Sequence, residues 1–303
     1  MSNKTILIMG ADGMLGKMVS LYFGSLNQYS IVLTARSESD FLNKHFNDII
    51  EHFDVLNDNF EHFAKKINPD FIVNCVGRIK PTIDEANPTS VSETININSF
   101  FPIEIQKYSA INNSRYYQIG TDCVYSGKDG NYNEDDYLDA EDLYGKSKIV
   151  GELPARNKHI IRSSIIGPEH GTGRSLLNWF LKNESTEVSG FKNHLWNGVT
   201  TLNFAKVIHG LILNQNYSTG LQHLITSDKV TKADLLHFFK IYFDKEININ
   251  KVNAENIIDR TLTTINNKNN EQLWIDAGYN KVPSVEENIA ELSESEFTKM
   301  ILN

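Results

Sequence analysis

A tyrosine and a lysine, Tyr144 and Lys148, lie four positions apart in the segment Asp142–Lys148, which can form a helix. Positions four apart share one face of a helix, so the two side chains would lie side by side. A neighbouring ammonium group stabilises a phenolate and lowers the pKa of tyrosine from about 10 toward neutrality. Such a tyrosine is a general acid that can give a proton to a carbonyl oxygen. The spacing is common by chance, but here it follows a glycine-rich turn and a threonine that ends a predicted strand.

The glycine-rich turn lies near the start of the chain. The apolar run Thr5–Met9 predicts a buried strand, and the stretch from Lys17 to about Phe23 has helical spacing. The glycines between them are spaced G-x-x-G-x-x-G, which differs from the G-x-G-x-x-G fingerprint. A strand, a glycine turn and a helix N-terminus can together bind a pyrophosphate. The residues predicted to contact a dinucleotide in this turn are Gly10, Asp12, Gly13, Met14, Leu15 and Gly16.

This turn has two other interpretations. A tight turn without any ligand is the simpler alternative. A P-loop does not fit, because Met18 follows Lys17 where a serine or threonine should hold magnesium.

The next predicted strands carry the residues that would choose the cofactor. The run 30–35 reads as a strand that ends at Arg36. An arginine here suits the 2′-phosphate of NADP, whereas an acidic residue suits NAD, so Arg36 favours NADPH and leaves NADH open. An ordinary solvated arginine is the alternative. Phe53, Asp54 and Val55 read as a short strand, which would place Asp54 and Val55 near the adenine.

Strands and helices alternate through the first half of the chain. Predicted strands at 69–76 and 115–120 flank a helix that we expect from Glu93 to Ile111. This rhythm predicts an α/β fold with a doubly wound parallel sheet, the Rossmann arrangement. Because ligands bind at the carboxyl ends of such strands, Gly10, Gly77 and Thr121 should converge on one crevice.

The chain resembles the extended short-chain dehydrogenase/reductase superfamily over nearly its whole length, and within it the dTDP-4-dehydrorhamnose reductases and related nucleotide-sugar 4-keto reductases. The resemblance rests on the glycine turn, on Thr-Asp-x-Val-Tyr-x-Gly at 121–127 and on Tyr-x-x-x-Lys at 144–148. Further segments that fit are 74–77, 97–102, 161–167 and 197–201.

The resemblance implies roles for individual residues. Thr121 would hold the substrate carbonyl, Tyr144 would supply its proton, and Lys148 would bind the nicotinamide ribose and tune Tyr144. Further cofactor contacts implied are Cys75, Val76, Gly77, Asn98 and Ser164. The substrate contacts implied are Arg78, Asp122, Cys123, Ile165, Lys192, Trp196 and Arg260. Lys192 and Arg260 could meet a diphosphate or be surface charges, and Trp196 could stack on a base or belong to the core.

Three positions depart from the family pattern. Cys123 stands where an aromatic residue is usual, Ile165 where a tryptophan is usual, and Val199 where a proline is usual. In the family these positions line the sugar side of the pocket, so the cofactor chemistry transfers better than the identity of the sugar.

Composition and charge are consistent with an enzyme for small molecules. The 303 residues can form a Rossmann domain, expected at 1–166 with a return segment around 198–226, and a mainly substrate-binding α/β cap at 167–303. The net charge of -9 argues against nucleic-acid or membrane partners. The two cysteines read as buried thiols, and histidine spacing suggests no metal site. With a strand starting near Met1 and no apolar span, we expect a cytoplasmic protein, and a homodimer is open.

The sequence thus predicts an NADPH-dependent reductase of the 4-keto group of a nucleotide-linked 4-keto-6-deoxy sugar, used in deoxysugar or surface polysaccharide biosynthesis. Two alternatives stay open. One is a sugar-nucleotide epimerase or dehydratase on the same scaffold, which would retain its cofactor through the cycle. The other is a non-catalytic, NADP-binding regulatory subunit, which would be free to lose Tyr144 or Lys148, although this chain has both.

Overall fold

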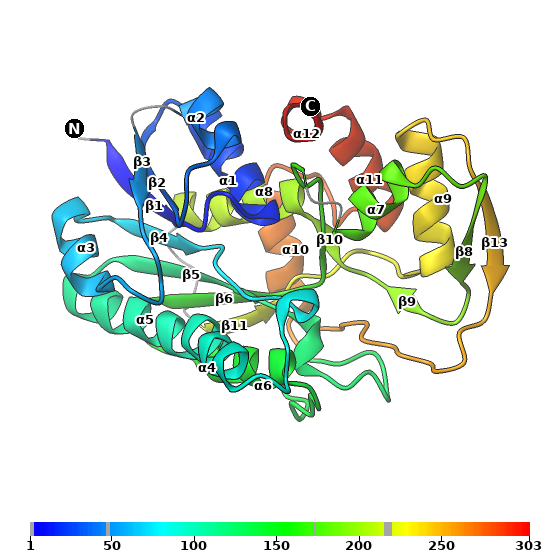
Figure 1. Cartoon of the computed structure of the whole chain (residues 1–303), viewed down its shortest axis with the longest axis horizontal. Coiled ribbons are helices and arrows are strands. Elements are labelled where there is room, and N and C mark those ends of the chain that lie inside the picture. Colours follow the sequence, from blue (N-terminus) through cyan, green and yellow to red (C-terminus); the bar gives the residue numbers. More distant parts are fainter. Residues whose placement is uncertain (1–2, 47–48, 172–173, 215–219) are drawn as a thin grey trace.

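A seven-stranded parallel sheet, built mostly from the first half of the chain, forms the centre of the fold (Figure 1). The computed structural model describes residues 3–46, 49–171, 174–214 and 220–303. The strand order is β11-β6-β5-β4-β1-β2-β3, so the chain starts in the middle of the sheet and builds outward in both directions. The strands are β1 (Lys4–Met9), β2 (Tyr29–Ala35), β3 (Ile50–His52), β4 (Phe71–Asn74), β5 (Arg115–Gly120), β6 (Lys158–Arg162) and β11 (Gly220–His223). This is the predicted α/β Rossmann arrangement.

Alternate residues of β1 enter two different cores, as the period of a strand requires. Ile6 and Ile8 pack in the core on the side of α1 and α8, whereas Leu7 and Met9 pack with residues of α3 and α5. Helices cover both faces in Figure 1. They are α1 (Met14–Ser25), α2 (Asp40–Phe46) and α8 (Thr201–Leu213) on one side, and α3 (Phe60–Ile67), α4 (Pro88–Ile95), α5 (Phe101–Asn112) and α6 (Leu143–Gly151) on the other.

Two predicted elements differ from those found. The strand predicted at 53–55 is wrong, because the strand is β3 and ends at His52. Asp54 instead accepts the N–H of Leu56 at 3.0 Å, and this side-chain turn diverts the backbone from the sheet. The single helix predicted from Glu93 to Ile111 is α4 and α5 joined by a π-helical turn, Asn96–Phe100. Pro102 lies in the first turn of α5 and lacks an N–H, which is consistent with the interruption.

The second half of the chain builds a smaller lobe and returns to the first. Edge strand β11 pairs with β6 of the large sheet, and α8 packs on α1. The loop at 167–173, where we placed the domain change, includes Thr172 and Gly173, which lie outside the described residues. The remaining elements are β7 (Ile165–Ile166), α7 (Leu176–Lys182), β8 (Glu187–Phe191), β9 (Leu195–Trp196), β10 (Val199–Thr200), β12 (Val230–Thr231), α9 (Lys232–Tyr242), β13 (Asn248–Val252), α10 (Asn267–Asp276), α11 (Val285–Glu294) and α12 (Glu296–Leu302).

Short two-stranded sheets organise this lobe. β8 pairs with β13, β9 with β12, and β7 with β10. The last helix, α12, contacts α1, so the C-terminal end of the chain lies against a helix that covers the large sheet (Figure 1). Across the described part of the chain, no helix combines the length and apolar character that crossing a bilayer needs.

Candidate active site

The glycine turn after β1 is shaped by two close backbone approaches. Gly10 has a φ of 74°, which favours glycine, and a side chain there would come within 2.8 Å of Val76. A Cβ on Gly16 would lie 2.0 Å from the carbonyl oxygen of Gly10. These two glycines therefore let α1 begin directly against the turn. Gly13 is less constrained, since its Cβ would make an ordinary contact of 3.5 Å.

The N-terminus of α1 is suited to an anion. Its N-cap residue is Gly13, which offers no side-chain cap, and no acidic residue lies in the first turn. Unmet N–H groups and the helix dipole attract a phosphate at such an end. The Asp12 side chain accepts hydrogen bonds from Lys17 Nζ at 2.6 Å and from the Ser39 hydroxyl. The cradle fits the pyrophosphate of a dinucleotide, with Asp12 holding the loop.

The residues predicted to choose the cofactor lie at the ends of β2 and β3. Arg36 is exposed and close enough to Asp54 to help lower the pKa of that carboxyl, after the main effect of the Leu56 N–H. The Asp54 side chain also accepts a hydrogen bond from Asn57 at 2.8 Å. Asp54 and the half-buried Val55 thus form the rim of this corner, and the exposed Arg36 lies near Asp54.

The catalytic candidates come together where β5 ends and α6 begins. Asp142 caps α6 by accepting the N–H of Gly145 at 2.8 Å. Lys148 is buried, and its Nζ donates to the carbonyl oxygen of Ile119 at 3.1 Å. Thr121 follows β5, and its side chain lies close enough to Tyr144 to oppose the rise that burial causes in the pKa of Tyr144. The structure therefore brings Thr121 and Tyr144 close together, with Lys148 one helical turn after Tyr144 on α6.

The pKa of Tyr144 differs from the expectation. We expected the ammonium of Lys148 to lower it, but burial raises the pKa of Tyr144 above its ordinary value, and nearby Cys123 and Asp122 raise it further. Burial also lowers the pKa of Lys148, which weakens its influence as a cation. Tyr144 is consequently protonated at neutral pH, the state in which it can donate a proton.

Asn98 acts as a clamp between the β4 loop and α6. Its Oδ1 accepts the N–H of Arg78 at 2.8 Å, and its Nδ2 donates to the Arg78 carbonyl at 3.0 Å and to Ser147 Oγ at 3.1 Å. It lies in the π-helical turn, which directs it inward. Gly77 lies beside the clamp, since a Cβ there would be 3.8 Å from Asn98 Oδ1.

The neighbours of this clamp have other partners. The guanidinium of Arg78 bonds to the Thr82 carbonyl at 2.9 Å and to Glu93, so it holds its own loop. A substrate contact by Arg78 is therefore not supported. Cys75 and Val76 follow β4, and burial raises the pKa of the Cys75 thiol. Both cysteines are free.

Three cations surround Cys123 on the substrate side. Burial raises the pKa of the Cys123 thiol to about 12, and the positive charges of Arg260 and Lys80 partly oppose this rise. Arg260 is fixed by a 2.8 Å bond from its Nε to the Tyr125 carbonyl. Lys232, the first residue of α9, lies near Asp122 and Cys123. The sequence singled out Arg260 but missed Lys80 and Lys232, since neither lies in a motif.

The other substrate-side candidates are placed differently. Trp196 is 4% exposed and donates through Nε1 to Ser164 Oγ at 2.9 Å, so it belongs to the core and is not placed to stack on a base. Lys232 Nζ lies 5.7 Å from the centre of its ring. Lys192 is exposed after β8. Ile165 pairs with Val199 between β7 and β10, so two of the three departures from the family pattern are neighbours.

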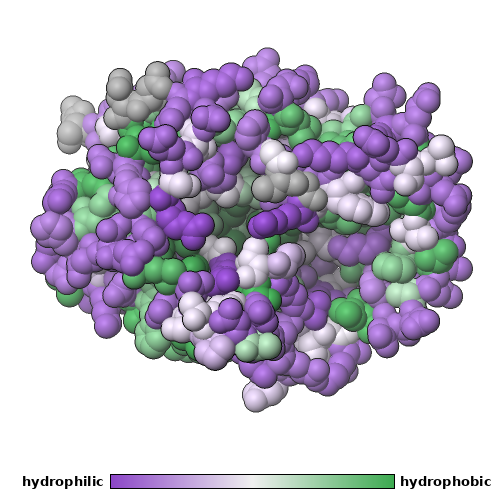
Figure 2. Space-filling view, in the orientation of Figure 1, coloured by the Kyte–Doolittle hydropathy of each residue, from purple (hydrophilic) through white to green (hydrophobic). Residues whose placement is uncertain are grey.

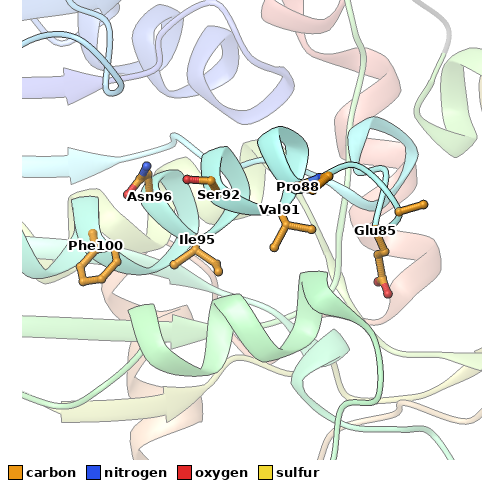
Figure 3. A pocket seen from close by; sticks show the side chains of 8 residues that line it. Glu85, Pro88, Val91, Ser92, Ile95, Asn96 and Phe100 are labelled. Carbon is orange, nitrogen blue, oxygen red and sulfur yellow. The ribbon is translucent and has the colours of Figure 1, made fainter.

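Figure 2 shows that polar residues cover most of one face of the molecule, with a recess near its middle. A separate cavity of about 570 Å³ lies on α4 and the π-helical turn, where Val91, Ile95 and Phe100 point to the same side (Figure 3). None of the catalytic candidates lines that cavity, and we assign it no ligand.

The fold is a Rossmann arrangement in which a glycine turn follows β1 and Thr121, Tyr144 and Lys148 lie near the end of β5. More narrowly, the chain belongs to the NAD dependent epimerase/dehydratase family, which it matches over residues 6–160.

Comparison with individual proteins gives relatives of more than one kind. Methionine adenosyltransferase 2 subunit beta of Bos taurus is 27% identical over 151 residues, 50% of this chain and 42% of that subunit. The chain thus matches less than half the length of this relative. Among solved structures, dTDP-4-dehydrorhamnose reductase of Bacillus anthracis in complex with NADP has a TM-score of 0.72 at 19% identity, covering 96% of this chain and 99% of that one. WbmG of Bordetella bronchiseptica, in complex with NAD and UDP, has a TM-score of 0.74 at 15% identity, covering 96% and 94%. At such identities the structural likeness shows the fold.

Proposed function

We propose that the protein is an NADPH-dependent reductase of a nucleotide-linked 4-keto-6-deoxy sugar. The observation that carries the proposal is the meeting of Thr121, Tyr144 and Lys148 at the carboxyl end of β5. Its fold neighbours, the NADP-bound reductase of Bacillus anthracis above all, support the same reaction class.

The chain's own residues account for the proton side of the reaction. A bound nicotinamide dinucleotide would supply the hydride. Thr121 would donate a hydrogen bond to the carbonyl oxygen, and Tyr144 would give its phenolic proton as negative charge develops on that oxygen. Lys148 would hold the ribose hydroxyls with its ammonium, which Ile119 already orients. The turn Gly10–Gly16 would hold the pyrophosphate.

The substrate side supports an anionic ligand such as a nucleoside diphosphate. Arg260 and Lys232 lie near Asp122 and Cys123, next to the catalytic group. Lys80 is partly neutralised by its ion pair with Asp142, which leaves Arg260 and Lys232 as the stronger candidates. These two side chains would hold the diphosphate while the sugar reaches Tyr144.

The test of this proposal is an assay of NADPH oxidation against a panel of nucleotide-linked 4-keto-6-deoxy sugars. Stoichiometric oxidation of NADPH with one sugar is the expected result. Turnover of a sugar without net oxidation would instead support the epimerase or dehydratase alternative, in which the cofactor is regenerated.

A second candidate, a nucleotide-binding subunit without its own reaction, is favoured by the likeness to methionine adenosyltransferase 2 subunit beta. Tight NADPH binding without turnover of any sugar in the panel would support it. The retained Tyr144 and Lys148 favour the reductase, because a subunit without catalysis would not need both.

A further inference from the structure

Glu152 lies at the C-cap of α6, on the same helix face as the catalytic candidates Tyr144 and Lys148. Tyr144, Lys148 and Glu152 are spaced by four residues, so they follow one another along one face of the helix and its C-cap. Glu152 is 4% exposed, and among the described residues it is the only acidic residue that is fully buried. A buried carboxylate is costly unless it is paired and hydrogen-bonded.

Both oxygens of Glu152 are engaged. Oε1 accepts the backbone N–H of Thr121 at 3.0 Å, and Oε2 accepts Arg162 Nε at 3.1 Å and Nη2 at 3.0 Å. The side chains of Glu152 and Arg162 are each 1% exposed. Oε1 therefore holds the backbone just after β5, at Thr121. Oε2 holds Arg162, the last residue of β6.

Arg162 is held in turn from its far side. Its Nη1 donates to the hydroxyl of Tyr125 at 2.9 Å and lies 3.0 Å from His223 Nε2. Burial, opposed by Glu134, lowers the pKa of His223 to about 4, so the ring is neutral at working pH and its Nε2 can accept this bond. The other ring nitrogen, Nδ1, lies 2.8 Å from the Thr263 carbonyl and can carry the proton.

Three buried cations face the single negative charge of Glu152. They are Lys148 on α6 and Lys158 and Arg162 on β6. Glu152 opposes the effect of burial on both lysines, and burial still lowers the pKa of Lys158 to about 8. Lys158 Nζ donates hydrogen bonds to the carbonyl oxygens of Gly151 at 2.7 Å and Leu153 at 3.0 Å. It therefore caps the C-terminal end of α6. Without Glu152, the three positive charges would repel one another in a buried space.

We propose that Glu152 is a positioning residue for catalysis, which fixes the backbone of Thr121 and supplies the negative charge in the buried space that it shares with Lys148. The inference rests on the proposed roles of Thr121, Tyr144 and Lys148. Glu152 itself touches neither substrate nor cofactor. It acts through Thr121 and Lys148, from a carboxylate at the C-cap of α6 that binds the end of β5 and Arg162 of β6.

The charged and titratable groups around Lys148 set the direction of the pH effect. On α6 they are Tyr144 and Glu152, and on β6 they are Lys158 and Arg162. The segment after β5 adds Asp122 and Cys123. Because Glu152 raises the pKa of Lys148, removing its charge lowers that pKa. Lys148 then loses its proton at lower pH, and the loss of activity at high pH begins earlier.

The test is Glu152→Gln, which keeps an oxygen for the Thr121 N–H but removes the charge. We expect the high-pH limb of the kcat profile to move to lower pH by about one unit or more, with kcat reduced at least about tenfold and KM for the sugar nearly unchanged. Glu141→Gln is the matched control, because Glu141 is exposed and pairs with Lys128 on the surface. It should leave the profile unchanged. An unshifted limb in Glu152→Gln would overturn the inference.

A readout without activity separates this inference from the proposed function. NMR titration of lysines labelled at Cε, with Lys148 assigned by loss of its signal in Lys148→Met, should show a lower pKa for Lys148 in Glu152→Gln. A lowered pKa in a protein that reduces no sugar supports the inference and counts against the reductase. An unchanged pKa in an active reductase refutes the inference alone.

A second variant serves if Glu152→Gln does not fold, as is common when one partner of a buried pair is removed. Lys158→Met removes a competing cation and leaves Glu152 in place. Lys148 and Lys158 repel each other, so each lowers the pKa of the other. Without the charge of Lys158, the pKa of Lys148 should rise and the high-pH limb of the kcat profile should move to higher pH. A shift in the opposite direction, or none, would refute the inference.

Discussion

Lys148 directs its ammonium group at the carbonyl oxygen of Ile119, 3.1 Å away, so the catalytic helix is tied to the strand that precedes Thr121. This bond helps to hold α6 against the end of β5, which Thr121 follows. It also leaves Tyr144 protonated, because burial dominates its pKa and the lysine is engaged with a backbone oxygen. The structure thus favours Tyr144 as a proton donor and not as a standing phenolate.

Tyr144→Phe tests the proton donor. We expect kcat to fall by roughly two to four orders of magnitude, the range for general acid catalysis, with NADPH affinity almost unchanged. Steady-state kinetics and titration of NADPH binding measure the two effects. Tyr137→Phe is the matched control, since Tyr137 is 86% exposed. Near-normal turnover in Tyr144→Phe would remove this residue from the mechanism.

Arg36→Ala tests the choice of cofactor. A guanidinium can pair bidentately with a 2′-phosphate, so the unaltered protein should prefer NADPH over NADH. The variant should lose this preference and keep its use of NADH, as measured by kcat/KM for each cofactor. Arg156, exposed after α6, provides the control Arg156→Ala. Equal use of both cofactors by the unaltered protein would contradict the assignment.

Lys232→Met tests the anion-binding side. Its ammonium lies near Asp122 and Cys123, and we expect it to hold the diphosphate in the ground state and the transition state alike. KM for the sugar nucleotide should therefore rise by roughly ten- to a hundredfold, because that is the change in affinity expected when one hydrogen bond to a charged group is lost. The value of kcat should change little. Lys268→Met, on the exposed start of α10, is the control. An unchanged KM would show that Lys232 serves only to pack against Trp196.

The identity of the sugar is tested by comparing kcat/KM for dTDP-4-keto-6-deoxy-L-mannose with that for a UDP-linked 2-acetamido analogue. Cys123 leaves more room than an aromatic residue, and Ile165 and Val199 are paired on neighbouring strands. We therefore expect a 4-keto-6-deoxyhexose, with the 2-acetamido sugar as a competitor. A preference of several orders of magnitude for the dTDP sugar would mean that the three replacements do not alter specificity.

Much of the fold followed from local patterns. The glycine spacing at 10–16, the alternation of apolar runs with helical segments and the Tyr144–Lys148 pair are each contained in a short stretch of chain. Such patterns set the local conformation of each segment, which is why the turn and the alternation of strands and helices, and with it the parallel sheet, were predictable. The strand misplaced at 53–55 failed for a local reason as well, since the turn made by Asp54 outweighed the apolar residues around it.

Long-range packing decided the rest. Trp196 has an aromatic side chain that could stack on a base. Its hydrogen bond to Ser164, 32 positions away in sequence, instead holds it in the core. Lys232 reaches the site only because β12 pairs with β9 and carries the start of α9 there. Glu152 is visible in sequence as the next residue in the helical stripe, but its partners Thr121 and Arg162 come from two separate strands. The sequence by itself determined which elements form and which residues can do chemistry. Only the tertiary structure decided which charges share a buried space, and that sets their pKa values because burial and neighbouring charges act through distance and not through sequence order.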